Sequence, residues 1–294
     1  MRIPYDLMRD GLAGINQAAE RMAAAQQQVS TGRRLNGAGD DPVAMQQATL
    51  VRSGLGAVDA YARSVDSAAS ALSWADATLS SFGDKLGAAI VAGLSARGNV
   101  SASSRAAAAE SIRMLRDGLL SDINTSFNGR AIFSGTQPSP TAYAFVGGAW
   151  VYQGNADQMQ VEVSKDRLVS VTFNGQELAQ GTDTTDVFTV MDQLVTAINA
   201  GNNAAIGTAL DGLQRAYDRA NRVQGRLGAD ERGLDDAALR LSTLRLAGEA
   251  RRSKFEDANM AEAITKLTDA QTAYKAALGS VSSTERLSLL DYLR

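Results

Sequence analysis

The chain has 294 residues, of which 45% are hydrophobic and only 5% aromatic, and its 29 basic and 32 acidic side chains leave a net charge of -3. This composition supports a hydrophobic core made of long helices that pack through small and aliphatic side chains, and the mixed charge gives little support to nucleic-acid binding. The absence of cysteine and histidine removes disulfides, thiol nucleophiles, imidazole bases and the usual zinc ligands. We therefore expect no enzyme, no cofactor and no metal site.

Residues 1–42 combine a heptad pattern with a glycine-rich loop. Apolar residues recur every seven positions at Met8, Ile15, Met22 and Val29. Leu12, Ala19 and Gln26 follow the first three of these by four residues. The spacing predicts a coiled-coil seam along a helix over residues 5–30, roughly 40 Å long. This segment and its connecting loop form the first predicted domain.

The loop from Gly32 to Asp41 contains three glycines and an Asn-Gly pair, and it ends in Asp41-Pro42. An aspartate followed by proline is typical of a helix N-cap and first helical position, so we expect Asp41 to be a cap and not a metal ligand. A long helix then runs to about Arg97, and a further helix begins at Ser101 or Ser103 and ends near Asn128. Residues 43–130 are thus interpreted as the first half of a helical rod.

Residues 131–183 change to the alternation typical of antiparallel strands. Strands are predicted at residues 150–152, 159–163 and 169–173, with turns at residues 164–167 and at Asn174-Gly175. The aromatic side chains of this β-rich outer domain could bind a glycan, but a small sheet also needs aromatics for its own core. The second interpretation is favoured.

Helical periodicity returns over residues 184–250, the second half of the rod, with breaks expected at Gly201 and near residues 225–228. Residues 251–294 form a C-terminal coiled-coil segment. Its seam positions are spaced alternately by four and three residues: Met260, Ile264, Leu267, Gln271, Tyr274, Leu278 and Val281. The predicted fold is mainly α with a small β-rich insertion, and the two terminal helices pair as an antiparallel coiled coil.

The N-terminus has charged residues at positions 2, 6, 9 and 10, and we expect no cleavable secretory leader there. The longest apolar stretch, residues 86–94, is too short to cross a bilayer, so no membrane insertion is expected. Taken alone, these features indicate a cytoplasmic protein.

Two motifs resemble those of a known family. VSTGRRLNGAGDDP at residues 29–42 resembles the signature that follows the first helix in bacterial flagellins and their junction relatives, and SKFEDANMAEA at residues 253–263 is similar to the matching C-terminal motif. Asn259 stands where the family usually has an aspartate. The signature residues are Gly32, Arg33, Asn36, Asp40, Asp41, Pro42, Glu256, Asp257 and Ala258. NGRAIFSG at residues 128–135 and SLLDYL at residues 288–293 resemble the junction members more than filament flagellins.

The resemblance implies a structural flagellar subunit that assembles with its own copies as a ring between hook-associated protein 1 and flagellin. It also implies an export chaperone, type III export without a cleaved leader, and an extracellular location, which replaces the cytoplasmic expectation. The seam residues would then form the assembly interface. Two alternatives stay open: a filament flagellin that polymerises alone, and a cytoplasmic coiled-coil binding protein.

Overall fold

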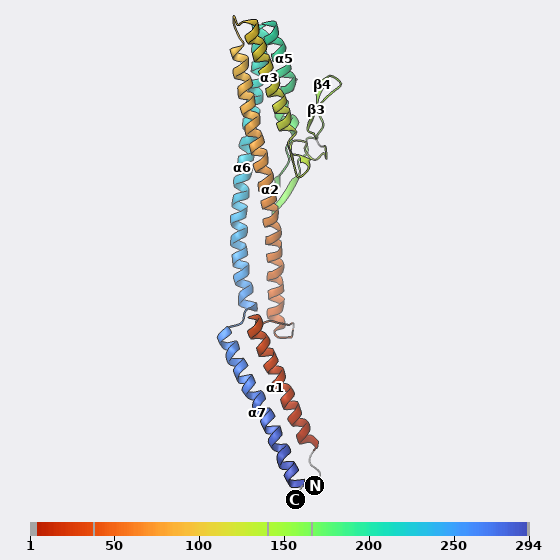
Figure 1. Cartoon of the computed structure of the whole chain (residues 1–294), viewed down its shortest axis with the longest axis vertical. Helices are drawn as coiled ribbons and strands as arrows, with labels where there is room; N and C mark the ends of the chain where they lie inside the picture. The colour runs from red at the N-terminus through yellow and green to blue at the C-terminus, as the bar shows by residue number, and fades with distance from the viewer. Residues whose placement is uncertain (1–4, 38, 140, 166, 293–294) are drawn as a thin grey trace. The chain divides into compact units, whose positions relative to one another are not determined.

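The computed structural model describes residues 5–37, 39–139, 141–165 and 167–292. The six long helices are α1 (Tyr5–Thr31), α2 (Pro42–Ser95), α3 (Ala102–Ile123), α5 (Val187–Ala200), α6 (Asn203–Glu256) and α7 (Met260–Tyr292) (Figure 1). The chain forms two compact units, one of Met1–Val58 with Thr243–Arg294 and the other of Asp59–Ser242. The predicted domains at residues 1–42 and 251–294 thus lie within the first unit, which also takes the start of α2 and the end of α6.

The β-rich part of the chain consists of three separate two-stranded antiparallel sheets. They pair β1 (Ser126–Phe127) with β2 (Arg130–Ala131), β3 (Tyr143–Val146) with β4 (Ala149–Tyr152), and β5 (Gln160–Ser164) with β6 (Arg167–Ser170). A short helix, α4 (Gly175–Ala179), follows β6. The predicted fold class, mainly α with a small antiparallel β insertion, is confirmed.

The core of the second unit lies between its helices. Large buried side chains come from α2, α3 and α5, including Phe82, Leu86, Ile112, Leu119, Met191 and Leu194. α3 packs against α5 (Figure 1). A Cβ at Gly93 of α2 would lie 2.7 Å from the side chain of Leu210 on α6 and 3.2 Å from that of Leu194 on α5, so the three helices approach each other closely at this glycine. The aliphatic packing predicted from the composition is therefore present in this unit.

The caps that start and stop these helices follow local chemistry. Ser101 accepts a hydrogen bond from the backbone N–H of Ser104 at the start of α3, and Gly201 ends α5 with φ of 66°. α5 ends at Ala200, and Gly201 adopts the left-handed backbone that suits glycine, so the predicted break at Gly201 is confirmed. α3 ends at Ile123, before the predicted residue 128, and Asn124 turns away to bond the backbone of Ala142 and Tyr143.

Two predicted breaks or turns are wrong. α6 continues through Gly225 and Gly228 without interruption, because two helical glycines cost only about 1 kcal/mol each and packing on either side outweighs that cost. Asn174-Gly175 is not a hairpin turn, since the Asn174 side chain accepts from Gln176 N and Glu177 N and caps α4.

The hairpin of β3 and β4 was predicted only in its second strand. Gly147 and Gly148 connect the strands with φ of 62° and 86°, a conformation that only glycine adopts without strain. Tyr143 is buried and stacks on Tyr152 and on Phe188 of α5, at ring separations of 5.3 Å and 5.2 Å. These aromatics are thus used by the core, as the sequence favoured.

Candidate assembly interface

The two sequence signatures meet in three dimensions. The loop after α1 pairs with the turn between α6 and α7 through backbone bonds: Arg34 N donates to Glu256 O at 2.6 Å, and Ala258 N donates to Gly32 O at 2.9 Å. The Arg34 side chain adds a bond to Phe255 O at 2.9 Å. We call residues 32–41 and 255–259 the clasp, because together they join segments that lie more than two hundred residues apart in the chain.

Within the clasp, the paired aspartates hold the loop and start α2. Asp40 Oδ2 accepts from the backbone N–H groups of Asn36 and Gly37 at 2.8 and 2.9 Å. Asp41 Oδ1 accepts from Ala44 N at 3.0 Å, and its other oxygen pairs with Arg34 at 3.2 Å. The Ala44 N–H and the Arg34 guanidinium together lower the pKa of Asp41 below its usual value. The capping role expected for Asp41 is therefore confirmed.

A small core and one ion pair lie beside the clasp. Leu35, Ala44 and Ala48 form a buried cluster against which Phe255 packs. Glu256 is only 2% exposed and accepts a hydrogen bond from Arg52 Nε at 2.7 Å. The signature glutamate thus links α6 to α2.

The departure from the family pattern at Asn259 is explained by its position. Its side-chain oxygen accepts from Ala261 N at 3.2 Å, immediately before α7 begins at Met260. An N-cap needs one side-chain oxygen, and asparagine and aspartate supply it about equally well.

The terminal helices α1 and α7 pack side by side and antiparallel (Figure 1). Six predicted seam residues lie half-buried between them: Ile15, Met22, Val29, Leu267, Tyr274 and Val281. The side chain of Met8 falls outside the described residues. One row of the heptad on each helix is therefore placed where the spacing predicted it.

The second row of each heptad differs from the prediction. On α1 the second row lies three residues after the first and consists of Gly11, Ala18 and Ala25. On α7 it lies four residues before the first and consists of Ala263, Ala270 and Ala277. A Cβ on Gly11 would come within 2.9 Å of Val281 Cγ2, so the helices are too close for large side chains in this row. Large residues of one helix thus face small ones of the other.

Three predicted seam residues of this second row consequently lie outside the α1–α7 contact. Leu12, Ile264 and Leu278 are 51%, 52% and 43% exposed, and Gln26 and Gln271 are also exposed. Met260 belongs to the first row and is 42% exposed at the start of α7. Leu12 directly follows Gly11, and Leu278 directly follows Ala277. Since successive residues turn by about 100° and the helices are antiparallel, both leucines project to the same side of the pair. Ile264, which directly follows Ala263, projects to this side as well. We call Leu12, Ile264 and Leu278 the outer apolar face.

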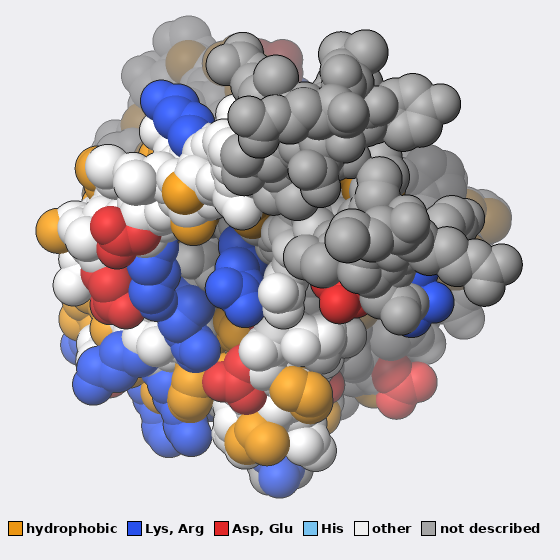
Figure 2. Space-filling model, turned by 90° about the horizontal axis from the view of Figure 1, so that it is seen from below, with side chains coloured by type: hydrophobic (Ala, Val, Ile, Leu, Met, Phe, Trp, Pro, Cys, Tyr) orange, Lys and Arg blue, Asp and Glu red, His pale blue; other side chains and the backbone are white. Residues whose placement is uncertain are grey.

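Charges do not separate into large areas of one sign on the face drawn in Figure 2, where acidic and basic side chains lie next to each other. Among the described residues, no group of three or more acidic, cysteine or histidine side chains is arranged to hold a metal ion. The described helices also include none that is long and apolar enough to cross a membrane.

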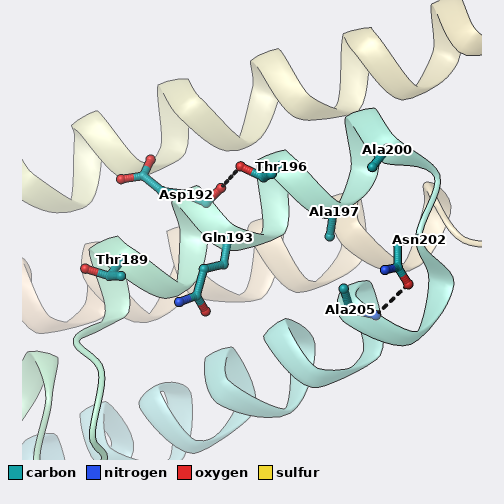
Figure 3. A pocket seen from close by; sticks show the side chains of 8 residues that line it. All are labelled: Thr189, Asp192, Gln193, Thr196, Ala197, Ala200, Asn202 and Ala205. Atoms are coloured by element: carbon teal, nitrogen blue, oxygen red, sulfur yellow. Dashed lines mark hydrogen bonds between the residues drawn. The ribbon is translucent and has the colours of Figure 1, made fainter.

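An open hollow of about 380 Å³ lies on α5 and the start of α6 (Figure 3). Its lining is small or polar, and Asp192 already pairs with Arg116 and accepts from Trp150 Nε1 at 3.0 Å. With its carboxylate engaged in this way, the hollow does not resemble a catalytic site.

The clasp is built from the two motifs that resemble those of bacterial flagellins. Residues 10–138 match the family model described as the bacterial flagellin N-terminal helical region. The resemblance to bacterial flagellins is thereby confirmed.

The chain is also similar to flagellar hook-associated proteins. The chain is 25% identical over its whole length to the entire flagellar hook-associated protein 3 of Salmonella typhimurium, and 24% identical to that of Escherichia coli, over 98% of each chain. Solved structures share the fold. A putative flagellar hook-associated protein from Vibrio parahaemolyticus aligns with a TM-score of 0.70 and 21% identity, covering 74% of this chain and all of its own. The flagellar junction protein FlgL from Legionella pneumophila aligns with a TM-score of 0.62 and 16% identity, covering 72% of this chain and 100% of its own.

Proposed function

We propose that this chain is a structural subunit of the bacterial flagellum and joins the hook to the filament. The observation that carries the proposal is the clasp, in which both flagellin-like signatures bond to each other and align the terminal helices. A full-length similarity to proteins named flagellar hook-associated protein 3 supports the junction over other positions in the flagellum.

The terminal helix pair supplies the contacts that such a role requires. A soluble protein seldom exposes several large apolar side chains along one side of a helix pair unless a partner covers them. The outer apolar face has this property, with each of its three side chains more than 40% exposed. We propose that neighbouring copies cover it in a ring, with hook-associated protein 1 on one side and flagellin on the other.

Export is part of the same proposal. The chain has no cysteine, so no cross-link opposes its passage in an unfolded state through a type III export channel. An export chaperone would cover the apolar terminal helices before assembly. The proposed location is therefore extracellular, at the flagellum.

Two other functions make different predictions. A filament flagellin would polymerise by itself, and seeded polymerisation of the purified chain into micrometre filaments would favour that function. A cytoplasmic coiled-coil binding protein would stay in the cytosol, with no flagellar pool on cell fractionation.

Deletion of the gene in the source bacterium tests the junction role. We expect cells with hooks but without filaments, and monomeric flagellin in the medium. Complementation with the Leu12→Glu, Leu278→Glu double variant should restore export of the chain but not filament growth, because charges on the outer apolar face oppose docking. Ala24→Glu, at an exposed position elsewhere on α1, is the matched control and should complement fully. Normal filaments in the deletion strain would contradict the proposal.

A further inference from the structure

The β3–β4 hairpin is apolar on both of its faces. One face carries Tyr143, Phe145, Trp150 and Tyr152, which face each other as cross-strand pairs. The opposite face carries Ala144, Val146, Ala149 and Val151. A hairpin with one face on a core normally presents polar residues to water on the other. This outward face has none.

The hairpin is also held firmly through its aromatic face. Trp150 packs on Phe188 of α5 at 5.4 Å, its Nε1 donates to Asp192, and the Arg116 guanidinium lies 5.7 Å from its ring. Near the turn, Phe145 and Val146 remain 59% and 55% exposed, and Val151, on the same face as Val146, is 39% exposed. A rigidly held hairpin with an exposed apolar end favours a pre-organised contact. We call Phe145, Val146 and Val151 the hairpin tip.

The same unit contains a groove of complementary chemistry. It lies between α2, the strands β1, β2 and β5, and the residues that directly follow β6, with a volume of about 270 Å³. Its walls include Ala71, Phe127, Ile132, Val161 and Val171. An apolar cavity of roughly 150 Å³ can hold a benzene molecule, and ligand pockets usually begin near about 300 Å³. The groove therefore has the size for one or two apolar side chains and is small for a drug-sized ligand or a glycan.

One cation borders the groove. Arg130 is half-buried there, and its guanidinium donates to Met159 Sδ at 4.0 Å, beside the apolar wall of the groove. A guanidinium in such a position can lie over an aromatic ring. Phe145 at the hairpin tip is an exposed aromatic ring that could take this place over the Arg130 guanidinium.

We propose that the hairpin tip of one copy docks into the α2–β groove of a neighbouring copy. Phe145 is too exposed to occupy the groove of its own chain, and tip and groove belong to one compact unit. When the tip of each copy docks into the groove of the next, the contact is head-to-tail, and its repetition generates a ring when the rotation closes. This inference rests on the proposed function, because it places the contact in the assembled junction.

The absence of cysteine permits a direct test in assembled flagella. Cells would express the Val146→Cys, Ser67→Cys chain, which has one thiol at the tip and one at an exposed position lining the groove. Mild oxidation should yield a ladder of multimers under non-reducing conditions. A mixture of the two single-cysteine chains should stop at dimers. The control pair Val146→Cys, Met114→Cys, with its second thiol 64% exposed on α3, should remain monomeric.

Two blocking variants complete the test. Val146→Glu puts a charge on the tip without contacting the aromatic stack, and Ser67→Trp fills the groove from the other side. Each should lower the amount of junction-bound protein by on the order of tenfold, the loss typical of a central interface residue, while Met114→Glu should not. Unchanged assembly in both, with no ladder, would overturn the inference while leaving the junction role intact. Absence of the unmodified protein from flagella would overturn both.

Discussion

Arg52 on α2 donates a hydrogen bond of 2.7 Å to Glu256 at the end of α6, across a separation of 204 residues. Glu256 is almost fully buried, whereas Arg52 is 44% exposed at its side chain. The pair therefore satisfies a buried carboxylate from the solvent side, next to the clasp that joins both ends of the chain.

Removing the arginine should destabilise the first unit. We expect Arg52→Met to lower its free energy of unfolding by about 2 kcal/mol, because a buried charged acceptor loses its partner. Both tryptophans, Trp74 and Trp150, lie in the other unit. Urea unfolding should accordingly show an earlier circular dichroism transition with unchanged tryptophan fluorescence. Arg251→Met, an exposed position on α6, is the control. Equal midpoints for the two variants would count against this role of Glu256.

The α1–α7 contact predicts opposite effects at two glycines of one helix. Gly14→Ala meets no atom within 4 Å and should stabilise α1 by up to about 1 kcal/mol through helix propensity. Gly11→Ala places a Cβ within 2.9 Å of Val281, a stiff β-branched side chain, and should lose that gain or destabilise the pair. Thermal unfolding followed by circular dichroism compares them. A Gly11→Ala chain as stable as Gly14→Ala would contradict the close packing of these helices.

The free energy of unfolding should fall at alkaline pH because of a buried tyrosine in the β3–β4 hairpin. Burial raises the pKa of Tyr143 well above its usual value, and the nearby Asp186 adds to the effect. Its contribution to stability is therefore complete below the unfolded pKa of about 10 and is lost as pH rises towards the folded pKa. Tyr143→Phe should flatten the fall in unfolding free energy between pH 10 and 12, by up to about 1.4 kcal/mol per pH unit.

Tyr152→Phe separates hydrogen bonding from ionisation. Its hydroxyl lies 3.0 Å from both Phe133 O and Asn155 O and donates its one proton to this pair of acceptors, so this change should cost about 1 kcal/mol already at pH 8. Tyr143→Phe should be near neutral at that pH. Urea titrations of both variants at pH 8 and 11 give the comparison, and identical pH profiles for Tyr143→Phe and the parent chain would rule out the burial effect.

The sequence predicted those features that depend on neighbouring residues. Asp41 and Ser101 are caps, Gly201 ends a helix, and the alternation around Val161 and Val169 marks paired strands, because each depends on chemistry within a few positions. Of the two residue rows that the heptads predicted for the α1–α7 contact, the second row is replaced by small residues in the structure. Periodicity favours the larger Leu12 over Gly11, but the distance between helix backbones selects the small residue, and that distance depends on α7.

The clasp lies beyond such local reasoning. Arg34 bonds to the carbonyl groups of Phe255 and Glu256, and no pattern near residue 34 indicates a partner near residue 256. Similarly, the apolar outward face of β3–β4 could not be seen before Gly147-Gly148 set the register of the two strands. The resemblance of the two motifs to flagellins signalled their importance, while their contact required the structure.

The position of the protein on the bacterium tests the central claim most directly. Antibodies raised against residues 59–242 would label the protein on purified flagella without an inserted epitope, which could perturb the β3–β4 hairpin. Immunogold electron microscopy should then place gold in a single band where the hook meets the filament. Gold distributed along the filament, or absent from flagella in cells that contain the protein, would contradict the account.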